Sequence, residues 1–107
     1  MGDNQDRGVR DLEEVRGADW SRATWAVPSD DESLVLARQT LTPRGGREVV
    51  WRVPAPRLPE LCELVAAPTS DAEGLLAWAE EDPDRLDALV GGLERMDPPV
   101  VDDISLS

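Results

Sequence analysis

The chain of 107 residues contains no histidine, no lysine, no tyrosine and no phenylalanine. General acid–base catalysis near neutral pH relies most often on histidine, lysine or a carboxylate with a shifted pKa. The first two are absent, and no pair of the many carboxylates stands out by its spacing. A serine nucleophile would lack a histidine or lysine base, and the sequence has no G-x-S-x-G motif. We therefore expect a protein that is not an enzyme.

The single cysteine, Cys62, excludes an internal disulfide and a zinc site built from cysteines. It follows Leu61 in an apolar helical pattern, where a thiol is typically a small core residue rather than a nucleophile. The densest run of acids, at 80–87, lacks the spacing of a calcium-binding EF-hand loop. The glycines at 45–46 lack the frame and the lysine of a phosphate-binding P-loop. We therefore expect no metal and no cofactor.

Long apolar runs are also missing. Apolar runs such as LVLA at 34–37 fall far short of the ~20 residues that a membrane span needs. The charged N-terminal sequence has no apolar segment of the kind that forms a signal peptide. All 11 basic residues are arginine, which is typical of GC-rich coding sequences. We expect a cytoplasmic protein of a high-GC bacterium that does not bind membranes.

The charge of the chain is strongly acidic and unevenly distributed. Its 11 basic and 23 acidic residues give a net charge of −12. Residues 1–60 carry 9 arginines and 11 acids, whereas residues 61–107 carry 2 arginines and 12 acids. Within the first part, residues 33–59 hold five arginines and one acid. This asymmetry predicts self-complementary packing, dimer contacts or a charged partner, and it does not choose among them.

The clearest structural pattern lies at 33–53. Apolar residues alternate with others on both sides of the turn sequence Pro43-Arg44-Gly45-Gly46, which predicts a β-hairpin. One parity gives the expected core face: Leu34, Leu36, Val49, Trp51 and Val53. A third strand could lie at 22–27, although the alternation there is imperfect.

Three helical patterns follow the hairpin. Pro59 suits the first turn of a helix whose apolar residues recur every three or four positions. Ser70 and Glu73 have the spacing of a capping box at the start of a second helix. Asp82-Pro83 predicts the start of a third, which Gly91-Gly92 would weaken or end.

These patterns predict an α+β fold with a small antiparallel sheet packed against two or three C-terminal helices. The sheet would consist of the hairpin at 33–53, with the segment at 22–27 as an optional third strand. A mainly helical domain with a protruding hairpin is the alternative. We expect one domain over 19–97, a flexible or frayed arm over 1–18 and an acidic flexible tail over 98–107.

The missing catalytic residues, the split charge and the acidic tail favour a non-enzymatic protein-interaction module, such as a small regulatory or accessory protein. Tryptophan and arginine dominate interaction hot spots, so they are the candidate partner-binding residues. The candidates are Trp20, Trp25, Arg38, Arg44, Arg47 and Arg52. The expected partner is another protein. A homodimer is a further alternative, because a hairpin leaves unpaired strand edges.

Three other functions remain open. The acidic half could mimic phosphates and act as a decoy that inhibits a nucleic-acid-binding protein. The arginine-rich hairpin could instead bind single-stranded nucleic acid by charge and by stacking on Trp51. Direct nucleic-acid binding is disfavoured, because a net charge of −12 repels phosphate and Trp51 is expected in the core. A carboxylate-dependent enzyme or metal site is the weakest alternative.

Overall fold

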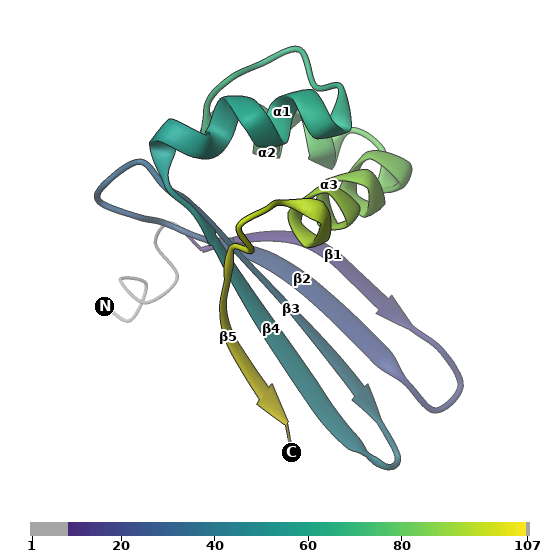
Figure 1. Cartoon of the computed structure of the whole chain (residues 1–107). Helices are drawn as coiled ribbons and strands as arrows, with labels where there is room; N and C mark the ends of the chain where they lie inside the picture. Colours follow the sequence, from purple (N-terminus) through teal and green to yellow (C-terminus); the bar gives the residue numbers. More distant parts are fainter. Residues whose placement is uncertain (1–8, 107) are drawn as a thin grey trace, which may run out of the picture.

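The computed structural model describes residues 9–106. Its elements are β1 (Arg10–Arg16), β2 (Ser21–Val27), β3 (Leu34–Thr42), β4 (Gly45–Val53), a 3-10 turn η2 (Ala55–Arg57), α1 (Leu58–Val65), α2 (Ala72–Glu80), α3 (Pro83–Arg95) and β5 (Val101–Leu106). The five strands form one antiparallel sheet in the order β1-β2-β3-β4-β5. The three helices lie over one end of the sheet, and the other ends of the strands project beyond them (Figure 1).

The fold is α+β, but the prediction of a small sheet of two or three strands was wrong. The hairpin of 33–53 is present as β3 and β4 in a sheet of five strands that extends over the whole described chain. The segment at 22–27 belongs to β2. Strands β1 and β5 occupy segments that we expected in a flexible arm and a flexible tail. Residues 1–8 of that expected arm lie outside the described residues.

Both missed strands are edge strands with weak hydrophobic patterns. Every described residue of β5 is exposed, and its polar–apolar alternation is confined to the four residues Asp103-Ile104-Ser105-Leu106, after the register shift that interrupts its pairing with β4. In β1 the pairing with β2 shifts register between Asp11 and Glu13, and this bulge breaks the period of two. Periodicity therefore could not identify either strand.

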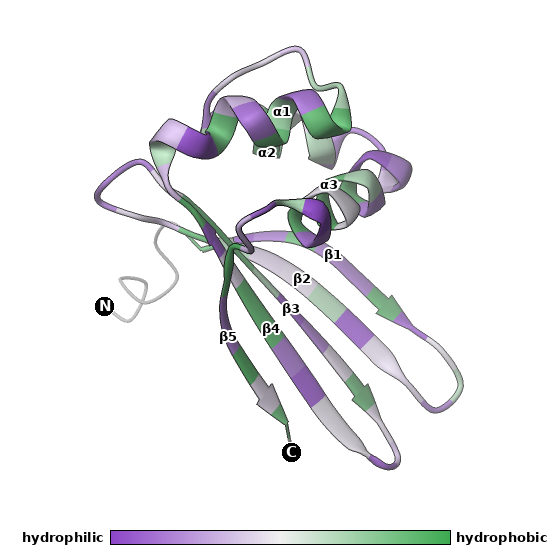
Figure 2. Ribbon diagram, viewed as in Figure 1, coloured by the Kyte–Doolittle hydropathy of each residue, from purple (hydrophilic) through white to green (hydrophobic). Residues whose placement is uncertain are grey.

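The core lies between the sheet and the helices. The face predicted from the hairpin alternation is confirmed, because Leu34, Leu36, Val49, Trp51 and Val53 are all buried. The largest fully buried side chains on the helices are Leu61, Leu75, Leu89 and Leu93. Strand β4 changes from apolar beneath the helices to polar toward its projecting end, as Figure 2 shows. The buried core therefore occupies one end of the sheet only.

The helix boundaries follow local signals. Pro59 stands in the first turn of α1, as predicted. Helix α2 is capped by Asp71 rather than by the predicted Ser70, and the Asp71 carboxylate accepts from the Gly74 backbone N–H at 2.7 Å. Asp82 caps α3 as predicted, accepting from the backbone N–H of Asp84 at 2.8 Å.

The two glycines in α3 do not end the helix, which continues to Arg95. Gly92 lies against α1, and a β-carbon at this position would be 2.5 Å from Val65 Cγ1. The absence of a side chain at Gly92 therefore allows α1 and α3 to approach closely. The prediction that these glycines weaken or end the helix did not consider this contact.

Candidate functional site

The first candidate site is the sheet face that points away from the helices. The strand register places Trp25 opposite Ala37, and Ala37 opposite Val50. Two residues further along β2, on the same face, Val27 pairs with Val35 of β3. We call these five residues the open-face strip. None of them belongs to the buried cluster between sheet and helices.

The open-face strip makes the central strands apolar on both sides. In β3, Val35 and Ala37 are only 6% and 2% exposed, and they alternate with the core residues Leu34 and Leu36. An antiparallel sheet with one solvated face normally alternates apolar and polar residues, whereas strands covered on both faces are apolar throughout. The second face of this sheet is therefore suited to packing against another surface.

Charged residues flank the open-face strip, and most of them are acidic. Asp11 of β1 lies opposite Trp25, and Asp103 of β5 lies opposite Val50. Glu48 lies one step further along the same face, opposite Gln39. The basic residues here are engaged by acids. Arg16 pairs with Glu14 at 2.8 Å, and Arg52 lies 3.8 Å from Asp31. Basic residues on a partner's surface would therefore favour binding to this acidic rim.

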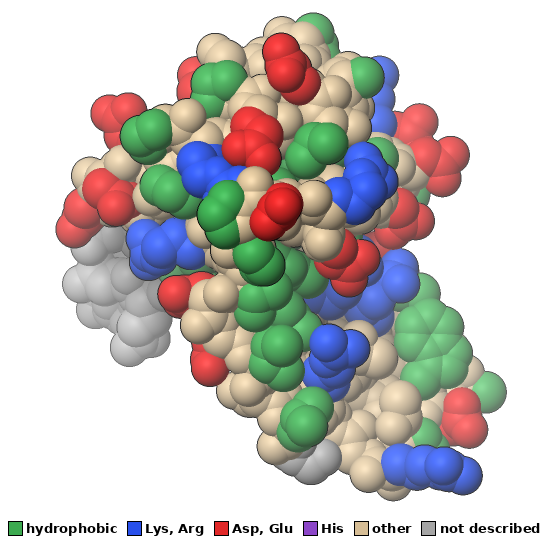
Figure 3. All heavy atoms as spheres, viewed as in Figure 1, with side chains coloured by type: hydrophobic (Ala, Val, Ile, Leu, Met, Phe, Trp, Pro, Cys, Tyr) green, Lys and Arg blue, Asp and Glu red, His purple; other side chains and the backbone are tan. Residues whose placement is uncertain are grey.

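The second candidate site lies on the other face of the projecting half-sheet, below α3. One cross-strand row there is Arg22, Thr40 and Arg47, and the next row contains Arg38 beside Val49. Three arginines therefore surround one threonine on the helix side of the sheet. In Figure 3 arginines (blue) lie beside a stripe of apolar side chains (green) on the sheet below the helices.

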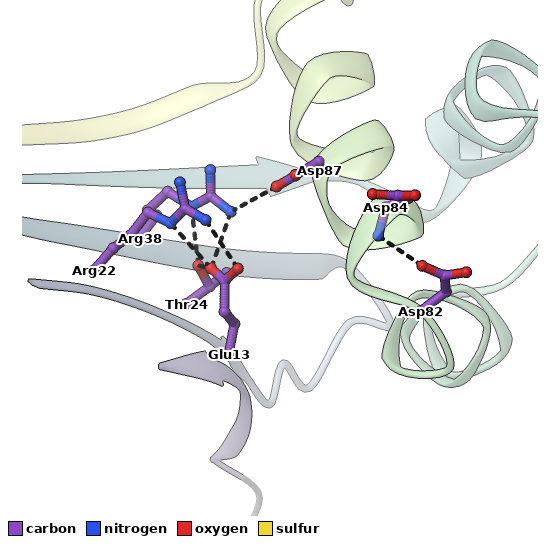
Figure 4. Close-up of polar contacts among 7 residues, drawn as sticks. All are labelled: Glu13, Arg22, Thr24, Arg38, Asp82, Asp84 and Asp87. Carbon is purple, nitrogen blue, oxygen red and sulfur yellow. Dashed lines mark hydrogen bonds and ion pairs between the residues drawn. The ribbon is translucent and has the colours of Figure 1, made fainter. Parts of the chain in front are cut away.

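Two of these arginines share one carboxylate (Figure 4). Arg22 donates from Nε and Nη2 to the two oxygens of Glu13 at 3.1 and 2.9 Å. Arg38 Nη2 donates to the same carboxylate at 3.4 Å, while its Nε donates to Thr24 Oγ1 at 2.9 Å. Asp87 of α3 lies 3.8 Å from Arg38 Nη2 and is largely exposed. The positive charge of the pair is therefore only partly balanced.

The pKa values of the two arginines reflect this imbalance. Hydrogen bonding to Glu13 raises the pKa of Arg22. Burial lowers the pKa of Arg38, and the nearby charge of Arg22 lowers it further. Both groups stay charged, because the guanidinium pKa begins above 12. A further anion near Arg38 would relieve the repulsion between the two.

The six predicted partner-binding residues do not form one surface. Arg38 and Arg47 lie together on the helix side of the sheet. Trp25 and Arg52 lie on the open face, and Arg44 lies in the exposed β3–β4 turn. Trp20 is 41% exposed in the β1–β2 turn, where its indole lies over Gly17.

Sequence reasoning missed several residues of both sites. Glu13 was missed because β1 was not predicted, and Arg22 and Thr40 could not be aligned with Arg47 without the register of β2. The open-face strip had a readable signal, since LVLA at 34–37 is apolar on both parities. The prediction assigned Leu34 and Leu36 of that run to the core face and did not consider what covers Val35 and Ala37 on the other face.

A hollow of about 800 Å³ opens at the helix-covered end between the loop after β2 and the start of α2. Arg10 at its edge is engaged by Glu73 and Glu80, at 2.8 and 2.7 Å. Val9, the first described residue, also lines it. Because the preceding residues are outside the described chain, we assign no site to this hollow.

The remaining chemistry of the described residues is limited. Cys62 is buried in the core, and burial raises the pKa of its thiol, which disfavours a reactive thiolate. Residues 9–106 contain no group of three or more side chains placed to hold a metal ion. Within the same range, no helix combines the length and apolar character needed to cross a bilayer.

Most acids of the run at 80–87 have structural roles. Glu80 pairs with Arg10, Glu81 pairs with Arg85 at 2.8 Å, and Asp82 caps α3. These carboxylates are thus less available to mimic a row of phosphates than the sequence alone suggested.

Compared with known proteins, the chain matches no family model, no curated protein and no solved structure.

Proposed function

We propose that this chain is a non-enzymatic protein-interaction module whose open face packs against a partner protein. The proposal rests on one observation. The central strands are apolar on both faces of the sheet, whereas the helices cover only one face. Packing a surface on the open-face strip would remove Trp25, Val27 and Val50 from water. Burial of apolar area is the main favourable term in protein association. In this proposal the protein is a small cytoplasmic regulator or accessory subunit.

The charge around the strip selects the kind of partner. Asp11, Glu48 and Asp103 flank it, and the whole chain carries a net charge of −12. A partner with an apolar patch flanked by basic residues would be attracted over long distances and would complement this rim. A second copy of the chain would bring acidic rims together. We therefore favour a different protein over a homodimer through this face.

The nucleic-acid alternatives have less support. The hairpin arginines lie on two opposite faces, and Trp51, the proposed stacking residue, is 3% exposed. A decoy would need a free row of carboxylates, but Glu80, Glu81 and Asp82 are engaged within the chain. An acidic module that binds a basic protein remains compatible with our proposal, provided that the open face makes the contact.

The proposal is tested by affinity capture from the source cells with matched variants. Val50→Asp adds a charge within the open-face strip, whereas Thr42→Asp adds the same charge at the end of β3 on the opposite face. We expect one protein to be recovered by the wild type and by Thr42→Asp, and lost with Val50→Asp. Circular dichroism establishes that both variants fold. Equal recovery with both variants, or no specific protein recovered by the wild type, would overturn the proposal.

A further inference from the structure

A small pocket lies on the helix side of the sheet, between the C-terminal half of α3 and β5. Its volume is about 220 Å³. Its charged lining residues are Arg38, Arg47 and Glu94, and its apolar lining residues include Val49, Trp51 and Ile104. It is on the opposite face of the sheet from the open-face strip, so its role does not depend on the function proposed above.

The hydrogen-bond donors in this pocket differ in how far they are satisfied. Arg47 takes part in none of the ion pairs formed among residues 9–106. Arg38 has partners, since it donates to Glu13 at 3.4 Å and to Thr24 at 2.9 Å and lies 3.8 Å from Asp87. Trp51 is 3% exposed, and its indole Nε1–H has no hydrogen-bond partner within the described chain. An unpaired buried donor is rare in native proteins and calls for an explanation.

Acceptors in the pocket are few, and its lining combines charged and apolar side chains. Glu94 is the one carboxylate among the lining residues. Val49, Val101 and Ile104 supply apolar contact, and Val101 and Ile104 are 45% and 49% exposed. A ligand suited to this lining carries a negatively charged acceptor for the arginines and an apolar portion for the valines. Arginine binds carboxylates well because its planar fork can donate two parallel hydrogen bonds.

The volume limits the size of the ligand. Pockets for drug-sized molecules measure roughly 300–1,000 Å³. A pocket of about 220 Å³ is below that range and suits a group of a few carbon atoms. A phosphorylated nucleoside or a large cofactor would not be enclosed by it.

We propose that this pocket binds a carboxylate carried on a short apolar stem. The carboxylate would lie between Arg47 and Arg38, and the stem would contact Val49 and Ile104. Two sources have this chemistry, namely a free short-chain carboxylic acid and an acidic side chain beside an apolar one in a protein segment. Glu94 opposes the bound anion, so its charge weakens binding.

The proposal is tested by NMR titration of the ¹⁵N-labelled full chain at constant ionic strength. One arm uses sodium butyrate, with butanamide as the uncharged match. The second arm uses the capped peptide acetyl-Leu-Glu-Leu-amide, with acetyl-Leu-Gln-Leu-amide as its match. We expect the charged probe in at least one arm to shift the Trp51 indole N–H and the Arg47 amide in a saturable way, and the neutral match to leave them unchanged.

Three variants locate the binding. Arg47→Gln should weaken it about tenfold, because a charge-assisted hydrogen bond is lost. Arg44→Gln removes the same charge from the nearby turn and should leave it unchanged. Glu94→Gln should strengthen it. All three positions are exposed, so the variants are expected to fold.

The outcome identifies the source. Saturation by butyrate alone supports a free acid, and saturation by the glutamate peptide alone supports a protein segment. Saturation by both probes supports a pocket that accepts the carboxylate from either source. The proposal is overturned if neither charged probe gives saturable shifts. It is also overturned if Arg44→Gln weakens binding as much as Arg47→Gln does.

Discussion

Gly92 of α3 lies so close to Val65 of α1 that a β-carbon at position 92 would be 2.5 Å from Val65 Cγ1. Real β-carbons essentially never show that separation, so the Val65 side chain or one of the helices would have to move. The neighbouring Gly91 differs, because a β-carbon there would meet only Arg95 Nη1, at an ordinary 3.7 Å. The two adjacent glycines therefore have opposite roles in one helix.

Replacing each glycine by alanine should change stability in opposite directions. Gly92→Ala should lower the free energy of unfolding by about 1–3 kcal/mol, as expected for overpacking of a tight contact. Gly91→Ala should raise it by about 0.5–1 kcal/mol, because alanine favours the helical backbone. Urea denaturation of the two variants measures both changes. Equal effects of the two substitutions would show that the contact with Val65 is not close.

Glu13→Gln tests the shared carboxylate at the centre of the arginine cluster. Removing the charge leaves Arg22 and Arg38 close together, both partly buried, with only the exposed Asp87 as a counter-ion, 3.8 Å from Arg38. We expect the free energy of unfolding to fall by about 2–3 kcal/mol. The matched control is Glu14→Gln. Its side chain is 60% exposed and pairs with Arg16, so a change below about 0.5 kcal/mol is expected. If Glu13→Gln also lowered the free energy of unfolding by less than about 0.5 kcal/mol, the arginine cluster would be effectively solvated.

Stability in acid should depend on Glu80. Its hydrogen bond from Arg10 lowers the pKa of the carboxyl below the ordinary value of 4.5. A carboxyl whose pKa is lowered by folding stabilises the folded state at pH values above its ordinary pKa. This contribution is lost as the pH falls through the lowered pKa. Glu80→Gln should therefore flatten the decline of stability below about pH 4.5.

The measurement is denaturant unfolding at a series of pH values between 2 and 7. Arg10→Gln should flatten the same part of the curve, and the double variant should add little to either single one. Additive effects of the two substitutions would contradict the pairing.

Cys62 should react slowly with thiol reagents in the folded protein. It is buried, and burial raises the pKa of its thiol, so both access and thiolate content are low. We expect Ellman's reagent at pH 8 to modify it much more slowly in buffer than in concentrated guanidinium chloride. Rapid modification without denaturant would show that α1 opens readily or that the thiol serves as a nucleophile.

The sequence predicted the parts of the fold whose side chains face two different environments. Val49, Trp51 and Val53 alternate with the less buried Val50 and Arg52 after a clear turn sequence, so the hairpin and its core face could be identified. Pro59 and Asp82-Pro83 mark helix starts by a mechanism that needs no tertiary contact. Strands β1 and β5 could not be identified in this way, because their stability comes from backbone pairing at the sheet edges.

The candidate sites were predictable only in part. Composition and hairpin position predicted Arg38 and Arg47 as partner-binding residues, and the structure places both on the helix side of the sheet. Their association with Arg22 depends on the register of β2 against β3, which the pattern of residues 22–27 does not determine. Trp25 was chosen because its segment alternates poorly, and the structure gives a reason for that pattern, since β2 is apolar on both faces near its end.

The central claim is that the open face binds a partner, and site-specific photo-crosslinking in the source cells tests it most directly. A benzophenone side chain at Gln39 lies on the open face beside the strip, and the same group at the exposed Glu63 of α1 is the control. We predict one discrete crosslinked adduct from position 39 and none from position 63. No adduct at position 39, or the same adducts at both positions, would contradict the account.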